Sequence, residues 1–221
     1  KYQISNRFQK VTYKPRIQLL RSMAEAIEQA IEQAEEAEDT EKLLSLIATC
    51  TEKRSVCGGE DENQDQEEAE DWETPTEAAL DAYYRLTKGP GGDHGHGVAV
   101  VHSCLNAWRE EEAIVEVGLG CLANVVGSPL AASSITDVPA LVVALMRAHP
   151  TEGTIQEQAC LVLEGLAKAA ADSSEESKES IRGTDGLREE VSAAVGRITN
   201  QRNKAYPKRV AVALRFELIS A

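Results

Sequence analysis

Three side chains that could ligate a metal lie close together in a glycine-rich stretch of the chain. The stretch GPGGDHGHG at 89–97 carries Asp93, His94 and His96 within four residues, and its glycines could also surround a phosphate. No phosphate-binding loop motif accompanies it, and a fourth metal ligand at a defined spacing is missing. We therefore expect no metal and no cofactor at this position.

The sequence also lacks a recognisable pairing of nucleophile and base. No GxSxG motif is present, and the serines gather at expected helix starts, where a hydroxyl caps the first turn. His102 falls on an apolar helical stripe, which predicts a hydrogen-bonded core histidine, and His149 is expected at a helix end. We predict that the protein is not an enzyme. The alternative would need a pocket formed by Asp93 to His102 and the neighbourhood of Cys104.

The cysteines are odd in number and scattered along the chain. Cys104, Cys121 and Cys160 lie on or beside apolar stripes, which indicates buried free thiols. Free thiols are typical of an intracellular reducing compartment, the cytoplasm or an organelle interior. A disulfide between Cys50 and Cys57 is the alternative.

Charge and composition exclude other classes of protein. The formal net charge of −14 argues against nucleic-acid binding, because phosphate contacts need a basic surface. There is no run of about 18 apolar residues, so no transmembrane segment is predicted. A chain with 42% hydrophobic but only 4% aromatic residues suits stacked aliphatic helices.

Two stretches share one apolar pattern at an offset of 41 residues. AIVEVGLGCLANVV at 113–126 and TIQEQACLVLEGLA at 154–167 both place apolar or small residues at i, i+4, i+7, i+8 and i+11. That spacing keeps one face of a helix against a core. Gly118 and Ala159 fall at the same place in the two copies, where a small residue lets a neighbouring helix approach closely.

The segments before these copies match as well. DVPALVVALMRAH at 137–149 follows GVAVVHSCLNAW at 97–108 by 40 residues, and a third version begins at Leu187, another 49 residues on. A two-helix unit with a period of 40 to 49 residues is typical of helices that stack into a solenoid.

At these residues the chain resembles the armadillo family. The family has a second helix of the form IPxLV and a third of the form vQExAxxALxNLA, similar to VPALV at 138–142 and IQEQACLVLEGLA at 155–167. CLANVV at 121–126 resembles the end of a third helix, and ESIRGTDGL at 179–187 resembles a short first helix with its glycine turn. The resemblance covers about residues 75–221. It implies an all-α fold, a right-handed α-solenoid of armadillo-like repeats with an N-terminal helical hairpin before them.

The resemblance also implies where a partner would bind. Armadillo third helices line a concave groove, and the positions that carry over are Val117, Asn124, Gln158, Leu161 and Lys168. Leu161 lies off the apolar stripe, where packing within its own repeat would not explain it. Members such as importin-alpha, which grip extended peptides, have a Trp four residues before the Asn; Gly120 stands there, so binding of that type is not expected.

Two segments are predicted to precede the repeats. Residues 1–14 form a basic N-terminal arm, and because the chain starts at Lys1 rather than Met, a fragment or N-terminal processing is expected. Residues 15–54 form a helical hairpin, with Asp39 or Thr40 capping its second helix.

An acidic linker is predicted at 55–74. Residues 58–73 hold nine acids and no base, which is typical of a disordered segment. The alternative is an acidic recognition segment anchored by Trp72; calcium chelation would need the absent EF-hand spacing. Thr74 followed by Pro75 has the form of a helix cap, which predicts a helix over 75–88.

The last part of the chain is basic and then apolar. Residues 197–215 hold six Lys or Arg and no acid, including Arg209, which we add to the candidate contact residues. The segment RVAVALRFELI at 209–219 is apolar over much of its circumference. It is therefore expected to contact a partner, or to be covered by further chain.

Together these patterns predict repeats at about 75–137, 138–186 and 187–221. The predicted function is a non-enzymatic protein–protein interaction scaffold, or a structural subunit of a larger assembly, that binds protein partners through the solenoid surface. The alternative is a chaperone cofactor, an armadillo-type nucleotide-exchange factor. The oligomeric state is not predicted.

Overall fold

The computed structural model describes residues 22–57, 62–88, 94–127, 137–173, 175–200 and 202–215. Within these ranges all regular structure is helical and no strand occurs, which confirms the all-α class for this part of the chain. Residues 1–21, with the predicted basic arm, and Asp93 of the glycine-rich stretch lie outside the described residues.

A helix at 22–36 begins the described part of the chain. It is followed in order by α2 (Thr40–Cys57), α3 (Glu62–Thr87), the 3-10 turn η1 (Gly95–Gly97), α4 (Val98–Ala107), α5 (Glu112–Val125), α6 (Val138–Ala148), α7 (Gly153–Ser173), α8 (Glu175–Arg182), α9 (Leu187–Arg197) and α10 (Tyr206–Leu214).

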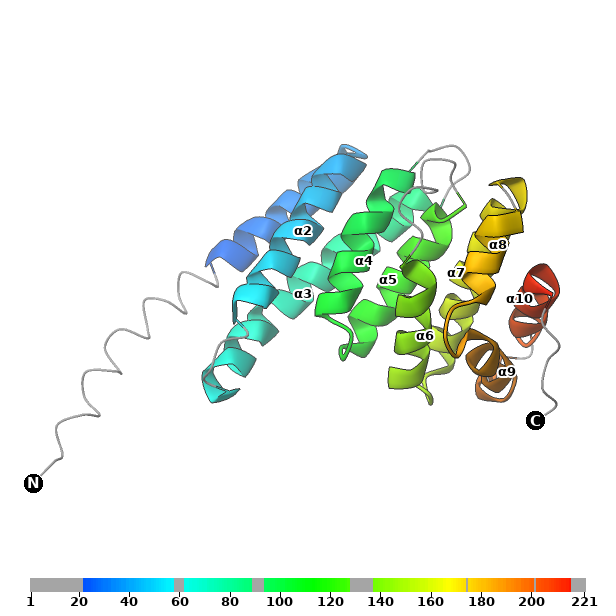
Figure 1. The fold of residues 1–221 in the computed structure, drawn as a ribbon. Coiled ribbons are helices and arrows are strands. Elements are labelled where there is room, and N and C mark those ends of the chain that lie inside the picture. Colours follow the sequence, from blue (N-terminus) through cyan, green and yellow to red (C-terminus); the bar gives the residue numbers. More distant parts are fainter. Residues whose placement is uncertain are drawn as a thin grey trace, which may run out of the picture.

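Most of the helices alternate between two layers along an extended row (Figure 1). Layer A consists of α3, α5, α7 and α10, each packed on the next, and layer B consists of α2, α4, α6 and α9 in the same succession. One apolar core runs between the layers, from Ile31 near one end to Leu214 near the other. The fold is therefore a helical-repeat array in which each unit contacts mainly its neighbours.

The repeated apolar pattern corresponds to neighbours in space. The two copies at an offset of 41 residues are α5 and α7, which lie side by side in layer A. All ten patterned positions are buried in the core: Ile114, Gly118, Cys121, Leu122, Val125, Ile155, Ala159, Val162, Leu163 and Leu166. The close approach expected at Gly118 is confirmed, because a Cβ there would lie 2.6 Å from Cδ2 of Leu105 on α4.

Polar contacts follow the same period. Cys121 Sγ donates to the carbonyl of Leu80, 41 residues earlier, and Thr154 Oγ1 donates to Glu116, 38 residues earlier. His149 ends α6, as predicted, and its Nε2 lies 2.7 Å from the carbonyl oxygen of Arg109, 40 residues earlier. The repeat spacing is thus also the spacing at which side chains join adjacent units.

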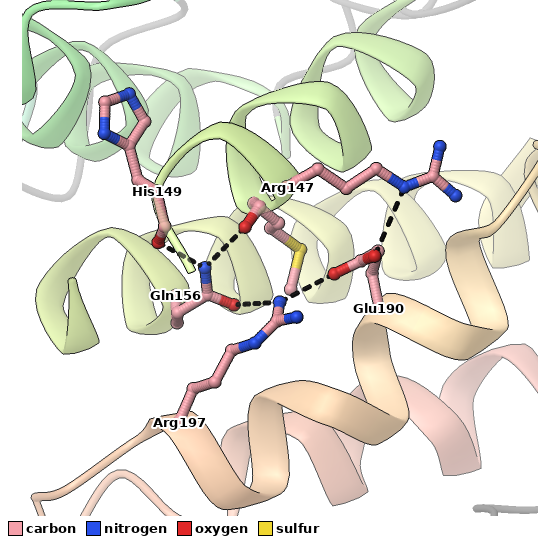
Figure 2. Close-up of polar contacts among 6 residues, drawn as sticks. Arg147, His149, Gln156, Glu190 and Arg197 are labelled. Carbon is pink, nitrogen blue, oxygen red and sulfur yellow. Dashed lines mark hydrogen bonds and ion pairs between the residues drawn. The ribbon is translucent and has the colours of Figure 1, made fainter. Parts of the chain in front are cut away.

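Gln156 is the centre of a buried polar network that joins α6, α7 and α9 (Figure 2). Its side chain is fully buried, and Nε2 donates to the carbonyls of Met146 and His149, each at 2.9 Å. Its Oε1 accepts a bond from Arg197 Nη1 at 3.4 Å. Arg197 in turn bonds Glu190 on the same helix, α9. Gln156, on α7, therefore joins layer A to α6 and α9 of layer B.

The predicted start of α3 is wrong. The helix begins at Glu62, not at Pro75 after a Thr74 cap, and so carries Pro75 in its interior. Trp72 is fully buried, so it anchors the helix in the core rather than in a partner. Thr76 Oγ1 donates to the carbonyl of Trp72, beside the position where Pro75 lacks an N–H. The predicted end is confirmed within one residue, at Thr87.

The predicted C-terminal helix is shorter and better covered than expected. It ends at Leu214, where Arg215 takes a positive φ of 57°. Val210, Ala211 and Leu214 face the core, and Val212 is the only large exposed apolar side chain in the described residues, at 79% exposure. The rest of the predicted apolar segment, 216–219, lies outside the described residues.

Candidate functional site

The six predicted contact residues all lie in layer A. Val117 and Asn124 are on α5, Gln158, Leu161 and Lys168 are on α7, and Arg209 is on α10. Lys168 and Arg209 are exposed, and the other four are half-buried. They therefore come from three successive helices of one layer.

Asn124 is tied to the preceding unit. Its Nδ2 donates to the carbonyl of Tyr84 at 3.4 Å and to Thr87 Oγ1 at 3.3 Å, both in the last turn of α3. A helix leaves its last carbonyls without partners of its own, so the amide of Asn124 satisfies one of them. The contact holds α3 and α5 in register.

The ring of Tyr84 lies beside Gly120, the position at which armadillo members that grip extended peptides have a Trp. A Cβ added at Gly120 would be 3.1 Å from Tyr84 Cε2 and 3.8 Å from Gln158 Oε1. Residues of α3, α5 and α7 thus meet at Gly120. Lys88 places its ammonium 5.4 Å from the ring centroid of Tyr84, which adds a cation to this part of layer A.

A carboxylate holds Lys168 and Arg209 together. Glu164 is buried, at 8% exposure, and its oxygens lie 2.9 Å from Lys168 Nζ and 2.8 Å from Arg209 Nη2. Burial alone would raise the pKa of Glu164, but hydrogen bonds from Lys168 and Arg209 and their charges outweigh it and hold that pKa below its usual value. Arg209 also lies over the ring of Tyr206, 4.4 Å from its centroid.

These charged groups surround an apolar groove between α7 and α10, which we call the α7/α10 groove. Its volume is about 390 Å³, and its lining consists of Glu164, Lys168, Ala205, Lys208, Arg209, Val212 and Ala213. Val212 gives the groove an exposed aliphatic wall. Three cations to one carboxylate make its rim positive, in a protein whose net charge is −14.

A second, larger groove separates α4 from α6 in layer B. It has a volume of about 690 Å³ and presents Ala140, Ala144 and Ala148 beside Arg109 and Arg147. His102 lies on its wall and is only half-buried, with Nδ1 3.3 Å from Asn106 Nδ2. The prediction of a core histidine is therefore wrong, because α4 turns this part of its patterned face towards the groove.

The groups suggested for catalysis include Cys104, whereas Asp93 lies outside the described residues. Cys104 is fully buried, and burial raises the pKa of its thiol to about 12, so little nucleophilic thiolate exists at neutral pH. Cys50 is a buried free thiol, so the alternative of a disulfide with Cys57 is wrong. Within the described ranges, no three His, Cys, Asp or Glu side chains gather in a way that could hold a metal ion.

Comparisons with known proteins give no family for the chain: no protein family, no curated protein and no solved structure matches it. In the described part of the chain no helix is long and apolar enough to cross a membrane.

Four residues of the layer A surface were missed in the sequence: Tyr84, Glu164, Tyr206 and Val212. Tyr84 precedes Asn124 by 40 residues, which is one repeat period, so the repeat spacing could have predicted that the two residues lie close together. Glu164 resembles any exposed helical acid in the sequence, because its two cations come from one turn later and from another helix.

Proposed function

We propose that the array is an armadillo-type right-handed solenoid, and that it works as a non-enzymatic scaffold or structural subunit that binds another protein through layer A. The observation that carries the proposal is the placement of six half-buried or exposed side chains on α5, α7 and α10. Successive helices of a solenoid present such residues as one extended surface, which suits a macromolecular partner better than a small molecule.

The composition of this surface supports the same function. It has apolar groups at Val117 and Leu161, and charged groups at Lys168 and Arg209. Protein interfaces combine an apolar centre with a polar rim, and a few large side chains supply most of the binding free energy. Glu164 and Tyr206 fix Arg209 in place before binding, which lowers the entropy lost on association.

A matched pair of variants tests this function. Leu161→Asp places a charge on layer A, and Ala144→Asp places the same charge at an exposed position on α6 in layer B. Affinity isolation of the tagged protein from its source cells, quantified by mass spectrometry, should recover partners with Ala144→Asp as with the unmodified chain. Recovery with Leu161→Asp should fall at least ~10-fold, since central interface residues commonly contribute that much.

Equal helical content of the two variants is the control for folding. If Ala144→Asp abolishes recovery while Leu161→Asp does not, binding runs through layer B and the proposal fails. If Leu161→Asp loses its helical signal, Leu161 belongs to the core, and Lys168→Glu then takes its place as the test of the surface.

A further inference from the structure

One end of the array is strongly acidic. Residues 22–41 hold eight Asp or Glu and no Lys or Arg, and we call them the acidic end. Seven of these acids are exposed: Glu25, Glu28, Glu32, Glu36, Glu38, Asp39 and Glu41. Glu35 is the one member of the acidic end that pairs with a base among the described residues, through Arg85 at 2.9 Å.

The other end is basic. Residues 202–215, which include α10, hold five Lys or Arg and no acid, and we call them the basic end. Lys204 and Lys208 form no ion pair with any residue of the described ranges. The α7/α10 groove opens beside them, with Lys168 on its rim and Val212 exposed.

The two ends cannot neutralise each other within one molecule. Figure 1 shows the helix at 22–36 and α10 at opposite ends of the row, with the remaining helices between them. Complementary surfaces held apart in this way can meet only between molecules.

We propose that the α7/α10 groove and the basic end bind the acidic end of a second copy of this chain. The inference goes beyond the proposed scaffold function and does not depend on it; because both use Lys168 and Arg209, a second copy and another partner would compete for the α7/α10 groove. A helix of 15 residues is about 22 Å long, enough to cover the groove beside the shorter α10. Its exposed face carries Glu25, Glu28 and Glu32 for the lysines, and the small Ala26 can lie against Val212.

The contact has two physical consequences. It is heterologous, since different surfaces meet, so in a dimer one copy keeps a free acidic end, the other keeps a free basic end, and association continues beyond a dimer. It is also small and formed mainly by exposed charges, so it is weak and sensitive to salt.

Sedimentation velocity and light scattering on the full chain test the proposal. At ~50 mM NaCl the average mass should rise from the monomer value of 23.9 kDa at ~10 µM to at least ~2-fold above it at ~300 µM. At ~500 mM NaCl the chain should stay monomeric, because the Debye length falls to a few ångströms.

Charge reversal identifies the two surfaces. The variant Glu28→Lys/Glu32→Lys reverses two charges on the exposed face of the acidic end, and Lys204→Glu/Lys208→Glu reverses two charges beside the α7/α10 groove on the basic end. Each variant alone should remain monomeric, because charges of the same sign now face each other at the centre of the proposed contact. Mixed in equal amounts they should associate at least as strongly as the unmodified chain, because basic and acidic ends again match.

The variant Glu112→Lys/Glu189→Lys is the control for Glu28→Lys/Glu32→Lys, since it makes the same change of net charge at exposed positions outside the acidic and basic ends. It should associate like the unmodified chain. The proposal is overturned if the unmodified chain is monomeric throughout, if reversal at either end leaves association intact, or if mixing the reversed variants does not restore it. A monomer that instead binds an acidic leucine-containing peptide, and loses it with Val212→Asp, would assign the groove to a different protein and would equally overturn self-association.

Discussion

Replacing Gln156 by leucine is expected to destabilise the array because Gln156 supplies a hydrogen bond that the backbone cannot. The carbonyl of Met146 would normally accept an N–H four residues later, but that residue is Pro150, which has none. The side chain of Gln156 donates to Met146 instead, and to His149 as well, from a fully buried position.

The magnitude follows from these contacts. Leucine removes two neutral hydrogen bonds and the longer bond that Oε1 accepts from Arg197. It leaves at least one buried carbonyl without a donor, while it adds apolar burial of similar volume. With ~1 kcal/mol for each lost bond and ~1–3 kcal/mol for an unsatisfied buried group, the expected loss is about 2–4 kcal/mol. For a chain of this length that corresponds to a fall in Tm of about 4–16 °C.

The assay is urea and thermal unfolding followed by circular dichroism, combined with amide hydrogen exchange. Exchange should accelerate most in α6, α7 and α9, which the network joins. The control is Gln158→Leu, two residues along α7, where the half-buried amide makes no hydrogen bond to a described residue. A loss below ~0.5 kcal/mol for Gln156→Leu, or equal losses for both variants, would refute the argument.

Three further predictions follow from individual groups. Gly186→Ala should lower the free energy of unfolding by at least ~1–2 kcal/mol in chemical denaturation. The reason is that Gly186 has a φ of +73°, and a Cβ there would lie 1.6 Å from Arg147 Nη2. An unchanged denaturation midpoint would contradict this. The pKa of Glu164 is lowered on folding, so its ion pairs stabilise the folded state. Their contribution to the free energy of unfolding is complete above the unfolded pKa near ~4.3 and is lost as pH falls through the folded pKa. Unfolding of Glu164→Gln should therefore show a smaller loss of stability below about pH 4 than the unmodified chain, and parallel pH profiles would count against the ion pairs. Cys104 and Cys160, whose thiol pKa values burial raises to about 12, should resist alkylation at pH 8 until urea is added, whereas rapid labelling of the native chain would mean that the core opens there.

Much of the architecture was predictable because it rests on periodic apolar residues. The apolar pattern in α5 and α7 predicted which helix faces are buried. It also predicted a close approach at Gly118, where Leu105 packs. Asp39 was also a reliable local signal, since its Oδ1 accepts the backbone N–H of Lys42 at 2.8 Å. Signals of this kind depend only on residues close in sequence.

The failures arose where distant contacts overrode a local signal. Thr74 and Pro75 have the form of a helix start, yet the burial of Trp72 in the core extends α3 past them. His102 follows the core pattern, but it lies on the wall of the groove between α4 and α6 and is only half-buried. The six candidate contact residues lie in one layer. The pairing of Glu164 with Arg209 could not be predicted from the sequence, because it depends on the packing of α7 against α10.

Mapping crosslinks between this chain and a bound partner tests most directly whether layer A is the binding surface. Lysine-reactive crosslinking of an affinity-isolated assembly should join the partner to Lys88 beside Tyr84 and to Lys168 and Lys208 at the α7/α10 groove. Lys42 and Lys53 on α2 provide the comparison in layer B. Crosslinks concentrated on Lys88, Lys168 and Lys208 are the predicted result; partner crosslinks confined to Lys42 and Lys53 would contradict the account.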